Sequence, residues 1–280
     1  MTAAATGMPV YDSARRRRPL VSELENLRLH RGLLRLLVVR DLTVRYKRSA
    51  LGIWWTMLNP LLTTAVMFAV FSQVFRFQLP EGEPFIVYLL SGVILVGFFT
   101  QGVIAAGSSI VNSAGILTKV YVPPEVFALA AASAAGVNFL INLLPLLVIQ
   151  LLLGVGIPWT IVLVPVPAIL LLGLVTGIGL LVAAAAVYFY DVIDLTAVVL
   201  GLVGYLTPTF YPITIVPDQL RPLIEANPLY SYLLAFRNLV YLGRVPPWYV
   251  WAMMAATAVA ALVVGLGAFS RSWRRLVVLL

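Results

Sequence analysis

Few side chains in this sequence could carry out acid–base, nucleophilic or metal chemistry. The chain has no cysteine and a single histidine, His30, which excludes thiolate sites and multi-histidine metal sites. One pair of carboxylates, Asp191 and Asp194, stands at helical spacing beside a long apolar stretch. Catalysis by such a pair would need a histidine or a basic cluster nearby, and neither accompanies it. We therefore expect Asp191 to cap and begin a helix rather than to act as a catalytic acid or base.

The sequence also lacks the chemistry of a nucleotide-driven motor. A P-loop ends in a lysine followed by serine or threonine, whereas Lys47 and Lys119 are followed by Arg48 and Val120. The apolar stretches hold no ionisable residue near their centres, which disfavours a proton-coupled transporter. Ion coupling through backbone oxygens stays open. We expect a chain that is not an enzyme and binds no cofactor of its own.

Aromatic side chains are the next candidates for a binding role. Trp54, Leu61, Phe68 and Phe75 are seven residues apart, and Phe71 falls on the same helical face. Such a face can stack on sugar rings with little directional demand, which suits a sliding polymer. Packing against a neighbouring helix or against lipid is the other interpretation of this stripe.

The composition sets the kind of element that must position these residues. Hydrophobic residues make up 61% of the 280 residues and charged residues only 11%, with a mean hydropathy of +1.00. Soluble domains carry roughly 25% charged residues, so lipid must be the solvent for most of this surface. We predict an all-α integral membrane protein with six transmembrane helices near 58–77, 85–106, 126–153, 160–189, 195–215 and 247–270.

Polar residues inside the third predicted span indicate a special environment. Asn138 and Asn142 lie there, and amides in lipid are costly unless another group satisfies them. We therefore expect both side chains to face protein or a water-filled path.

Two segments precede the predicted spans. Residues 1–21 contain the basic run Arg15–Arg18 followed by Pro19, with no apolar region behind it, so we expect a disordered cytoplasmic tail rather than a signal peptide. Such a tail either holds the chain inside or binds lipid or a partner. Residues 22–48 are predicted to form an amphipathic interfacial helix. Its basic face would carry Arg28, Arg31 and Arg35, and its apolar face Leu29, Leu33, Leu36 and Leu37.

Two loops stand out from the 49–280 transmembrane region. Residues 107–124 are too polar to cross lipid and end in Pro123-Pro124, which predicts an inner loop with a short surface helix. Residues 216–246 hold a semi-apolar piece at 229–242 that is too short to span, which predicts re-entrant helices at the outer mouth. One face of this piece is apolar and consists of Leu229, Tyr232, Leu233, Phe236, Leu239 and Val240.

Charge predicts the orientation. With both termini and the 107–124 loop inside, 15 of the 19 cations fall on the inner side. The positive-inside rule therefore favours two cytoplasmic termini and an even number of spans in a cell membrane.

Three stretches together resemble a known family. The segment 40–62, RDLTVRYKRSALGIWWTMLNPLL, is similar to the entry into the first span of permeases from polysaccharide-exporting ABC transporters, such as those for O-antigen, teichoic acid and cell-wall galactan. Residues 112–124 resemble the coupling loop of that family. Residues 205–212, YLTPTFYP, with Asn227-Pro228-Leu229 and Phe236-Arg237, resemble its outer gate. Relatives often carry Arg-Asp at the inner end of the fourth span, where this chain has Tyr190-Asp191.

The resemblance implies a homodimeric permease with two copies of a separate ABC ATPase, which would bind ATP and magnesium. The cargo would be a polyprenyl-diphosphate-linked polysaccharide, with cell-wall galactan favoured by an arginine-rich composition of GC-rich appearance. The implied substrate-channel residues are Trp54, Phe68, Phe71, Phe75, Phe210 and Tyr211. The implied ATPase-coupling residues are Asn112, Ile116, Leu117, Lys119 and Tyr121, and the outer gate residues are Pro228, Tyr232, Phe236 and Arg237.

Other functions remain open at this level. An ABC efflux permease for small molecules or lipids would share these features. A membrane enzyme acting on lipid-linked sugars and a passive channel belong to other classes. ATP-dependent flux that requires a co-purified ATPase separates export from both of them.

Overall fold

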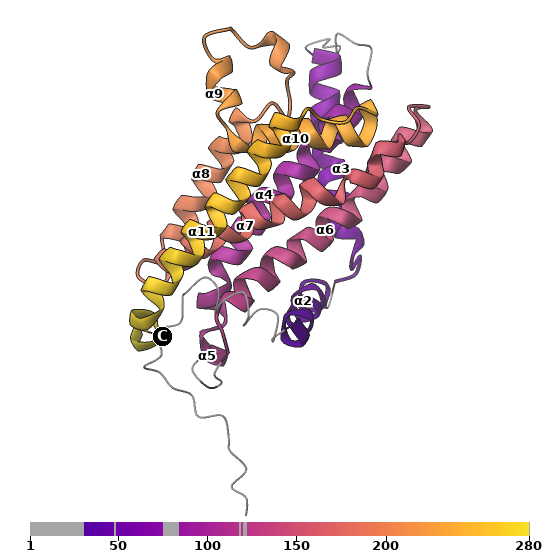
Figure 1. Ribbon diagram of the computed structural model, residues 1–280. Coiled ribbons are helices and arrows are strands. Elements are labelled where there is room, and N and C mark those ends of the chain that lie inside the picture. Colours follow the sequence, from indigo (N-terminus) through magenta and orange to yellow (C-terminus); the bar gives the residue numbers. More distant parts are fainter. Residues whose placement is uncertain (1–30, 48, 75–83, 118, 120–121, 280) are drawn as a thin grey trace, which may run out of the picture.

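The computed structural model describes residues 31–47, 49–74, 84–117, 119 and 122–279, and the regular structure in these ranges is entirely helical (Figure 1). The longer elements are α2 (Arg31–Tyr46), α3 (Trp54–Ala69), α4 (Phe85–Asn112), α6 (Glu125–Leu152), α7 (Pro165–Ala186), α8 (Val192–Leu206), α10 (Pro228–Arg237) and α11 (Trp248–Leu279). The short ones are η1 (Val70–Val74), α5 (Ala114–Leu117), η2 (Trp159–Leu163), η3 (Ile213–Ile215), α9 (Arg221–Glu225) and η4 (Asn238–Leu242).

Five helical segments are long and apolar enough to cross a bilayer, which confirms a multi-pass membrane protein. They are Trp54–Ser72, Phe85–Asn112, Glu125–Leu152, Trp159–Ala186 and Trp248–Ser272. The predicted fifth span, 195–215, corresponds to α8, which has only 15 residues. Thr207 ends α8 in an extended conformation because the ring of Pro208 disfavours a helical residue before it. The count of six full-length spans therefore stays a prediction.

The two ends of the bundle carry different elements (Figure 1). The helix α2 lies at one end beside α6, together with α5 and the last turns of α11, and we name this the α2 end. The short helices α9 and α10 lie at the opposite end, which we name the α10 end. The chain runs from α2 up α3 to the α10 end and returns down α4.

The core is built around α4. This helix is the most buried of the five candidate spans and contacts α3, α6, α7, α8 and α10. Small residues allow α4 and α7 to approach closely, since a Cβ at Gly102 would lie 2.7 Å from Cγ1 of Val175. Close backbone approach through glycine and alanine is the usual way that helices associate in lipid, where there is no hydrophobic driving force between them.

The helices α7 and α11 form an even closer pair. A Cβ at Gly177 would overlap the backbone of Ala261, and one at Gly265 would overlap the backbone of Gly177. We name this contact the glycine seam. It leaves no room for a side chain or a ligand between the two helices.

From Arg31 onward the segment predicted at 22–48 forms the helix α2, whose faces differ in burial, while Arg28 and Leu29 lie outside the described residues. Leu33 and Leu37 pack against the bundle while Arg31 and Arg35 are exposed. Leu36, predicted on the apolar face, is 63% exposed because the packed stripe runs through Leu33, Leu34, Leu37 and Val38. Such a one-sided helix suits the surface of a membrane protein.

The predicted inner loop, residues 107–124, is partly helical in the structure. Residues 107–112, expected in the inner loop, form the last turns of α4, and Gly107 is buried against Val182 of α7. Polar Ser108 and Ser109 do not stop the helix because each donates to a carbonyl in the preceding turn. The short helix α5, Ala114–Leu117, lies within the range where a short surface helix was expected. Asp191 stands at the N-terminus of α8 as expected, but its side chain does not cap the helix.

Candidate functional site

A polar groove runs between α2, α3, α4 and α6. It consists of two cavities of about 530 and 520 Å³ that share Arg45, Gln101, Ala135 and Asn138. One cavity reaches Asn112 and Ser113 near α5, and the other reaches the level of Val93 on α4. Val93 and Asn112 are nineteen positions apart on α4, which corresponds to about 28 Å along the helix. The groove therefore extends from the α2 end deep into the bundle.

Tyr46, at the last turn of α2, joins three helices at the groove. Its hydroxyl donates to Oδ1 of Asn138 on α6 at 2.7 Å and also contacts the hydroxyl of Thr56 on α3. This three-way contact holds the end of α2 against the start of α3. The prediction that Asn138 faces protein is confirmed by this bond, and Asn142 lines the same cavity.

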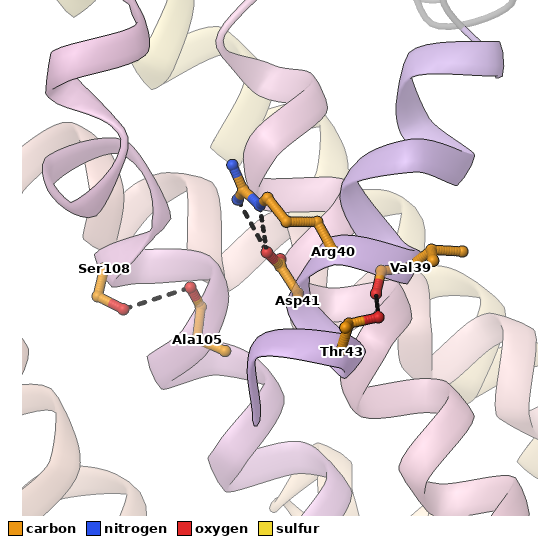
Figure 2. A network of polar contacts seen from close by, with 6 residues as sticks. All are labelled: Val39, Arg40, Asp41, Thr43, Ala105 and Ser108. Carbon is orange, nitrogen blue, oxygen red and sulfur yellow. Dashed lines mark hydrogen bonds and ion pairs between the residues drawn. The ribbon is translucent and has the colours of Figure 1, made fainter. Parts of the chain in front are cut away.

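Two cations of α2 border the groove in different states. Arg40 pairs with the adjacent Asp41, at 2.8 Å between Nη2 and Oδ1 (Figure 2). Ser108 of α4 lines the same cavity, and its hydroxyl donates to the carbonyl of Ala105 in its own helix. Arg45 instead donates through Nη2 to Oε1 of Gln101 at 3.3 Å. Within the described residues it has no carboxylate within ion-pair distance. Its charge is therefore not compensated by an acid.

At the α10 end, the predicted channel aromatics meet in a small cluster. The rings of Phe68 and Phe71 lie 6.3 and 6.1 Å from the ring of Phe85, and Phe210 packs against the same cluster. Tyr88 completes it, stacked on Phe85 at 6.1 Å. Phe75 lies outside the described residues.

The seven-residue stripe does not form one surface. Trp54 stands at the α2 end of α3 and is 66% exposed, fourteen residues from Phe68. Leu61 packs against the main core instead of the aromatic cluster. A straight helix drifts relative to a strict seven-residue repeat, because 3.6 residues per turn do not divide seven evenly.

Arg237 is the most enclosed cation of the described chain. Its side chain is 7% exposed, and its guanidinium lies 3.5 Å from the centroid of the Tyr88 ring. It donates to the carbonyl oxygens of Pro208, Tyr88 and Thr209 at 2.9, 3.2 and 3.3 Å. The planar guanidinium thus ties α10 to α4 and to the segment that follows α8.

The segment 207–212 is held from two further sides. The hydroxyl of Tyr88 lies 2.9 and 2.7 Å from the carbonyl oxygens of Pro208 and Tyr211. Asn227 donates to the hydroxyl of Thr207 at 2.9 Å and caps α10 by accepting from the amide of Leu229. Tyr211 bends back, and its hydroxyl donates to the carbonyl of Tyr205. Tyr88 therefore connects Arg237 of the predicted gate with Phe210 and Tyr211 of the predicted channel.

The apolar face predicted for 229–242 is confirmed, since all six of its residues are buried. Tyr232 donates to the carbonyl of Met254 at 2.8 Å, and the ring of Phe236 lies 5.4 Å from that of Phe139. Burial raises the pKa of Tyr232 to about 12, so its hydroxyl stays protonated and keeps donating at neutral pH. Pro228 begins α10 at the first helical position, where its missing amide costs nothing.

The predicted coupling residues lie at the α2 end. Asn112, Ile116 and Lys119 are exposed, whereas Leu117 is half-buried and packs against the core. Tyr121 lies outside the described residues. Of the five predicted coupling residues, three are therefore exposed in the described part of the chain.

Sequence reasoning missed the residues that connect these regions. Tyr88, Ser91 and Gly92 share one face of α4, and a Cβ at Gly92 would lie 3.1 Å from Nη2 of Arg237. In the sequence, only their spacing of three and four residues indicated that they share a helical face. Nothing comparable pointed to Tyr46, whose partners are 10 and 92 residues away.

The fold defines a multi-pass membrane protein with a groove between α2, α3, α4 and α6. Residues 32–241 match the family model of the ABC-2 type transporter. The chain is 31% identical to O-antigen export system permease protein RfbA of Myxococcus xanthus over 87% of this chain and 93% of that protein. Two proteins of the same name from Klebsiella pneumoniae are 27% and 26% identical, over 83% of this chain and 88% of their own lengths. The chain therefore belongs to the ABC-2 type transporter family, and the resemblance to permeases of polysaccharide-exporting ABC transporters is confirmed.

Proposed function

We propose that this chain is the membrane-spanning permease of an ATP-driven exporter that moves a lipid-linked polysaccharide out of the cytoplasm. The observation that carries the proposal is the nearly full-length similarity to permeases named for O-antigen export. The matched family region begins within α2 and runs through α5 to η4, so it includes the groove, the loop around α5 and α10.

The working unit would be a homodimer of this chain with two copies of a separate ABC ATPase, which would bind ATP and magnesium. The exposed residues Asn112, Ile116 and Lys119 around α5 would contact the ATPase. Their position at the end of the long, buried helix α4 supports this role, because movement there would be transmitted along a rigid element.

The α2 end would face the cytoplasm of a cell with the chain in its inner or plasma membrane, and α10 would be a re-entrant outer gate. The described cations support this orientation. Those at the α2 end are Arg31, Arg35, Arg40, Arg45, Lys47, Lys119 and Arg271, and those at the α10 end are Arg221, Arg237 and Arg244.

Labelling from outside the cell tests this orientation. The chain has no native cysteine, so a single introduced one is the sole thiol. Asp218→Cys should react with an impermeant maleimide in intact cells, and Lys119→Cys should react only after lysis. Both positions are exposed, so equal labelling in intact cells would contradict the orientation.

The cargo is proposed as a polyprenyl-diphosphate-linked glycan. Its path would be neutral, with Phe68, Phe71, Phe210 and Tyr211 at the outer end, since rings offer stacking surface that tolerates sliding. Cell-wall galactan is the first glycan to test on compositional grounds, beside an O-antigen-type glycan suggested by the names of the relatives.

Reconstitution tests the function directly. Proteoliposomes that contain this chain and its ATPase should expose a fluorescent polyprenyl-diphosphate oligosaccharide to an external glycosidase only when ATP is supplied. The matched controls are the permease alone and a complex whose ATPase lacks its P-loop lysine. Flux without ATP would indicate a channel, and chemical turnover of the lipid by the permease alone would indicate an enzyme; either result would overturn the proposal.

The coupling role is tested by Ile116→Asp. Burying an unpaired carboxylate in a protein contact costs several kcal/mol, so we expect loss of ATPase co-purification. Val44→Asp is the control, because Val44 is also an exposed apolar residue at the α2 end but lies on α2. Equal ATPase recovery with both variants would contradict the coupling assignment.

A further inference from the structure

The groove between α2, α3, α4 and α6 contains more polar groups than the protein itself satisfies. Oδ1 of Asn142 is buried and has no hydrogen-bond partner among the described residues. The amide of Asn59 makes one long contact, accepting from the hydroxyl of Thr63 at 3.5 Å, and is otherwise exposed. A buried polar group without a partner costs roughly 2–7 kcal/mol, so Oδ1 of Asn142 needs water or a ligand, and the exposed amide of Asn59 is available to the same ligand.

Arg45 adds an available cation at the junction of the two cavities. A guanidinium has five N–H donors, and the one bond that Arg45 makes among the described residues goes to a neutral amide, Gln101. Arg40, by comparison, is neutralised by Asp41. Arginine binds phosphate oxygens through its planar fork, with charge-assisted bonds about twice as strong as neutral ones. The junction is therefore suited to an anionic, oxygen-rich group.

The rim of the groove favours a ligand that is anchored in lipid. Trp55 and Leu62 line the deeper cavity and are 52% and 54% exposed. Apolar side chains exposed on a bundle of this kind face lipid, so a hydrocarbon tail can stay in the bilayer while its head enters the groove. The volume of each cavity lies within the roughly 300–1,000 Å³ of small-molecule sites, enough for a diphosphate with one or two sugars.

We propose that this groove binds the phosphorylated sugar head of the lipid-linked glycan, with Arg45 on the phosphate and the amides of Gln101, Asn59 and Asn142 on sugar hydroxyls. The proposal rests on the function proposed above. It assigns recognition of the head to a site within one protomer, apart from the aromatic cluster that would contact the passing chain. Tyr46 is a positioning residue here, because it fixes Asn138 at the wall of the groove.

The test measures binding of four probes to the permease–ATPase complex in nanodiscs without nucleotide. The probes are a polyprenyl-diphosphate-linked disaccharide, the matching polyprenyl monophosphate, phosphatidylglycerol and inorganic diphosphate. We expect the disaccharide lipid to bind tightest, and Arg45→Gln to weaken it about tenfold through loss of a charge-assisted contact. Arg35→Gln is the control, since Arg35 carries the same charge on α2 but lines neither cavity.

Asn142→Leu separates binding from folding. Oδ1 of Asn142 has no partner in the described chain, so an apolar residue of similar size should leave the thermal midpoint unchanged while it weakens the disaccharide lipid severalfold. Three results would overturn the assignment. They are equal affinity for all the phosphorylated lipids, an equal loss of affinity in Arg35→Gln and Arg45→Gln, and unchanged affinity in both Arg45→Gln and Asn142→Leu. So would a disulfide-linked dimer formed through Gln101→Cys, because a second copy would then fill the groove. Wild-type ATP-dependent export combined with unaffected groove variants would reject this site and leave the proposed function standing, whereas absent export by the wild type would reject the function itself.

Discussion

The glycine seam and the polar groove are two helix contacts in the same bundle with opposite character. At the seam, Gly177 and Gly265 bring the backbones of α7 and α11 together so closely that neither position has room for a Cβ. At the groove, a Cβ on Gly97 of α4 would meet only Nε2 of Gln101 at 3.7 Å. One contact is closed by shape and the other is left open and polar.

The difference shows which half of the molecule is free to respond to a ligand. Backbone-to-backbone packing has essentially one arrangement, because any sliding produces overlap. The groove is instead bridged by side chains, chiefly Tyr46 and the Arg45–Gln101 contact, which can exchange partners. A transport protein needs both, a rigid frame and a wall that can accept cargo, and here the seam is formed by α7 and α11 and the groove by α2, α3, α4 and α6.

The largest effect is expected at the seam. Gly177→Leu places a branched side chain against the backbone of α11, which cannot be relieved by a rotamer change, and should cost more than about 5 kcal/mol. We expect no monodisperse protein after detergent extraction. Gly201→Leu on α8, where nothing lies within 4 Å, should be extracted like the wild type. Normal recovery of Gly177→Leu would mean that the seam is not closed.

Two arginines sharpen the comparison. Arg237 is enclosed and satisfied by backbone carbonyls, so Arg237→Leu leaves buried acceptors unpaired and should destabilise the protein by about 2–4 kcal/mol. Arg45→Gln removes an exposed cation and should change stability by less than about 0.5 kcal/mol. Thermal unfolding of both variants in the same detergent measures the difference. Similar losses would show that Arg45 is structural and would weaken its assignment to ligand binding.

Sequence reasoning predicted the elements better than the contacts between them. The apolar spans, α2 and the buried face of α10 follow from composition and helical periodicity, which are local properties of the chain. Arg237 was assigned to the gate by resemblance, but its enclosure by Tyr88 and Pro208 depends on residues 149 and 29 positions away. The groove was anticipated only through Asn138 and Asn142, because Arg45 looks like an ordinary surface residue until α2 folds back on the bundle.

The aromatic cluster at the α10 end offers a smaller effect. Phe71 is half-buried and contacts Phe85 edge-on, so Phe71→Ala should cost about 1–2 kcal/mol by loss of partly buried apolar area. If Phe71 lines the glycan path, export should fall while dimer yield and basal ATP hydrolysis stay normal. Val66→Ala, at an exposed position of α3 five residues before Phe71, is the control. Unchanged export by the Phe68→Ala, Phe71→Ala double variant would restrict the aromatic cluster to packing.

The smallest effect on stability, and the most direct test of the comparison, comes from two glycines on α4. Gly102 faces Val175 of α7 and Gly97 faces the groove, five residues away. Alanine is favoured over glycine in a helix by about 1 kcal/mol, so Gly97→Ala should keep or slightly raise the thermal midpoint. Gly102→Ala should lower the thermal midpoint, because the added methyl lies too close to Cγ1 of Val175 unless that side chain moves.

A larger residue at Gly97 tests whether the groove is open. Gly97→Leu should still fold, but its side chain fills part of the cavity and should reduce binding of the lipid-linked disaccharide. If Gly97→Leu unfolds the protein, the groove is a packed contact like the one between Gly102 and Val175, and the contrast between these two faces of α4 does not hold.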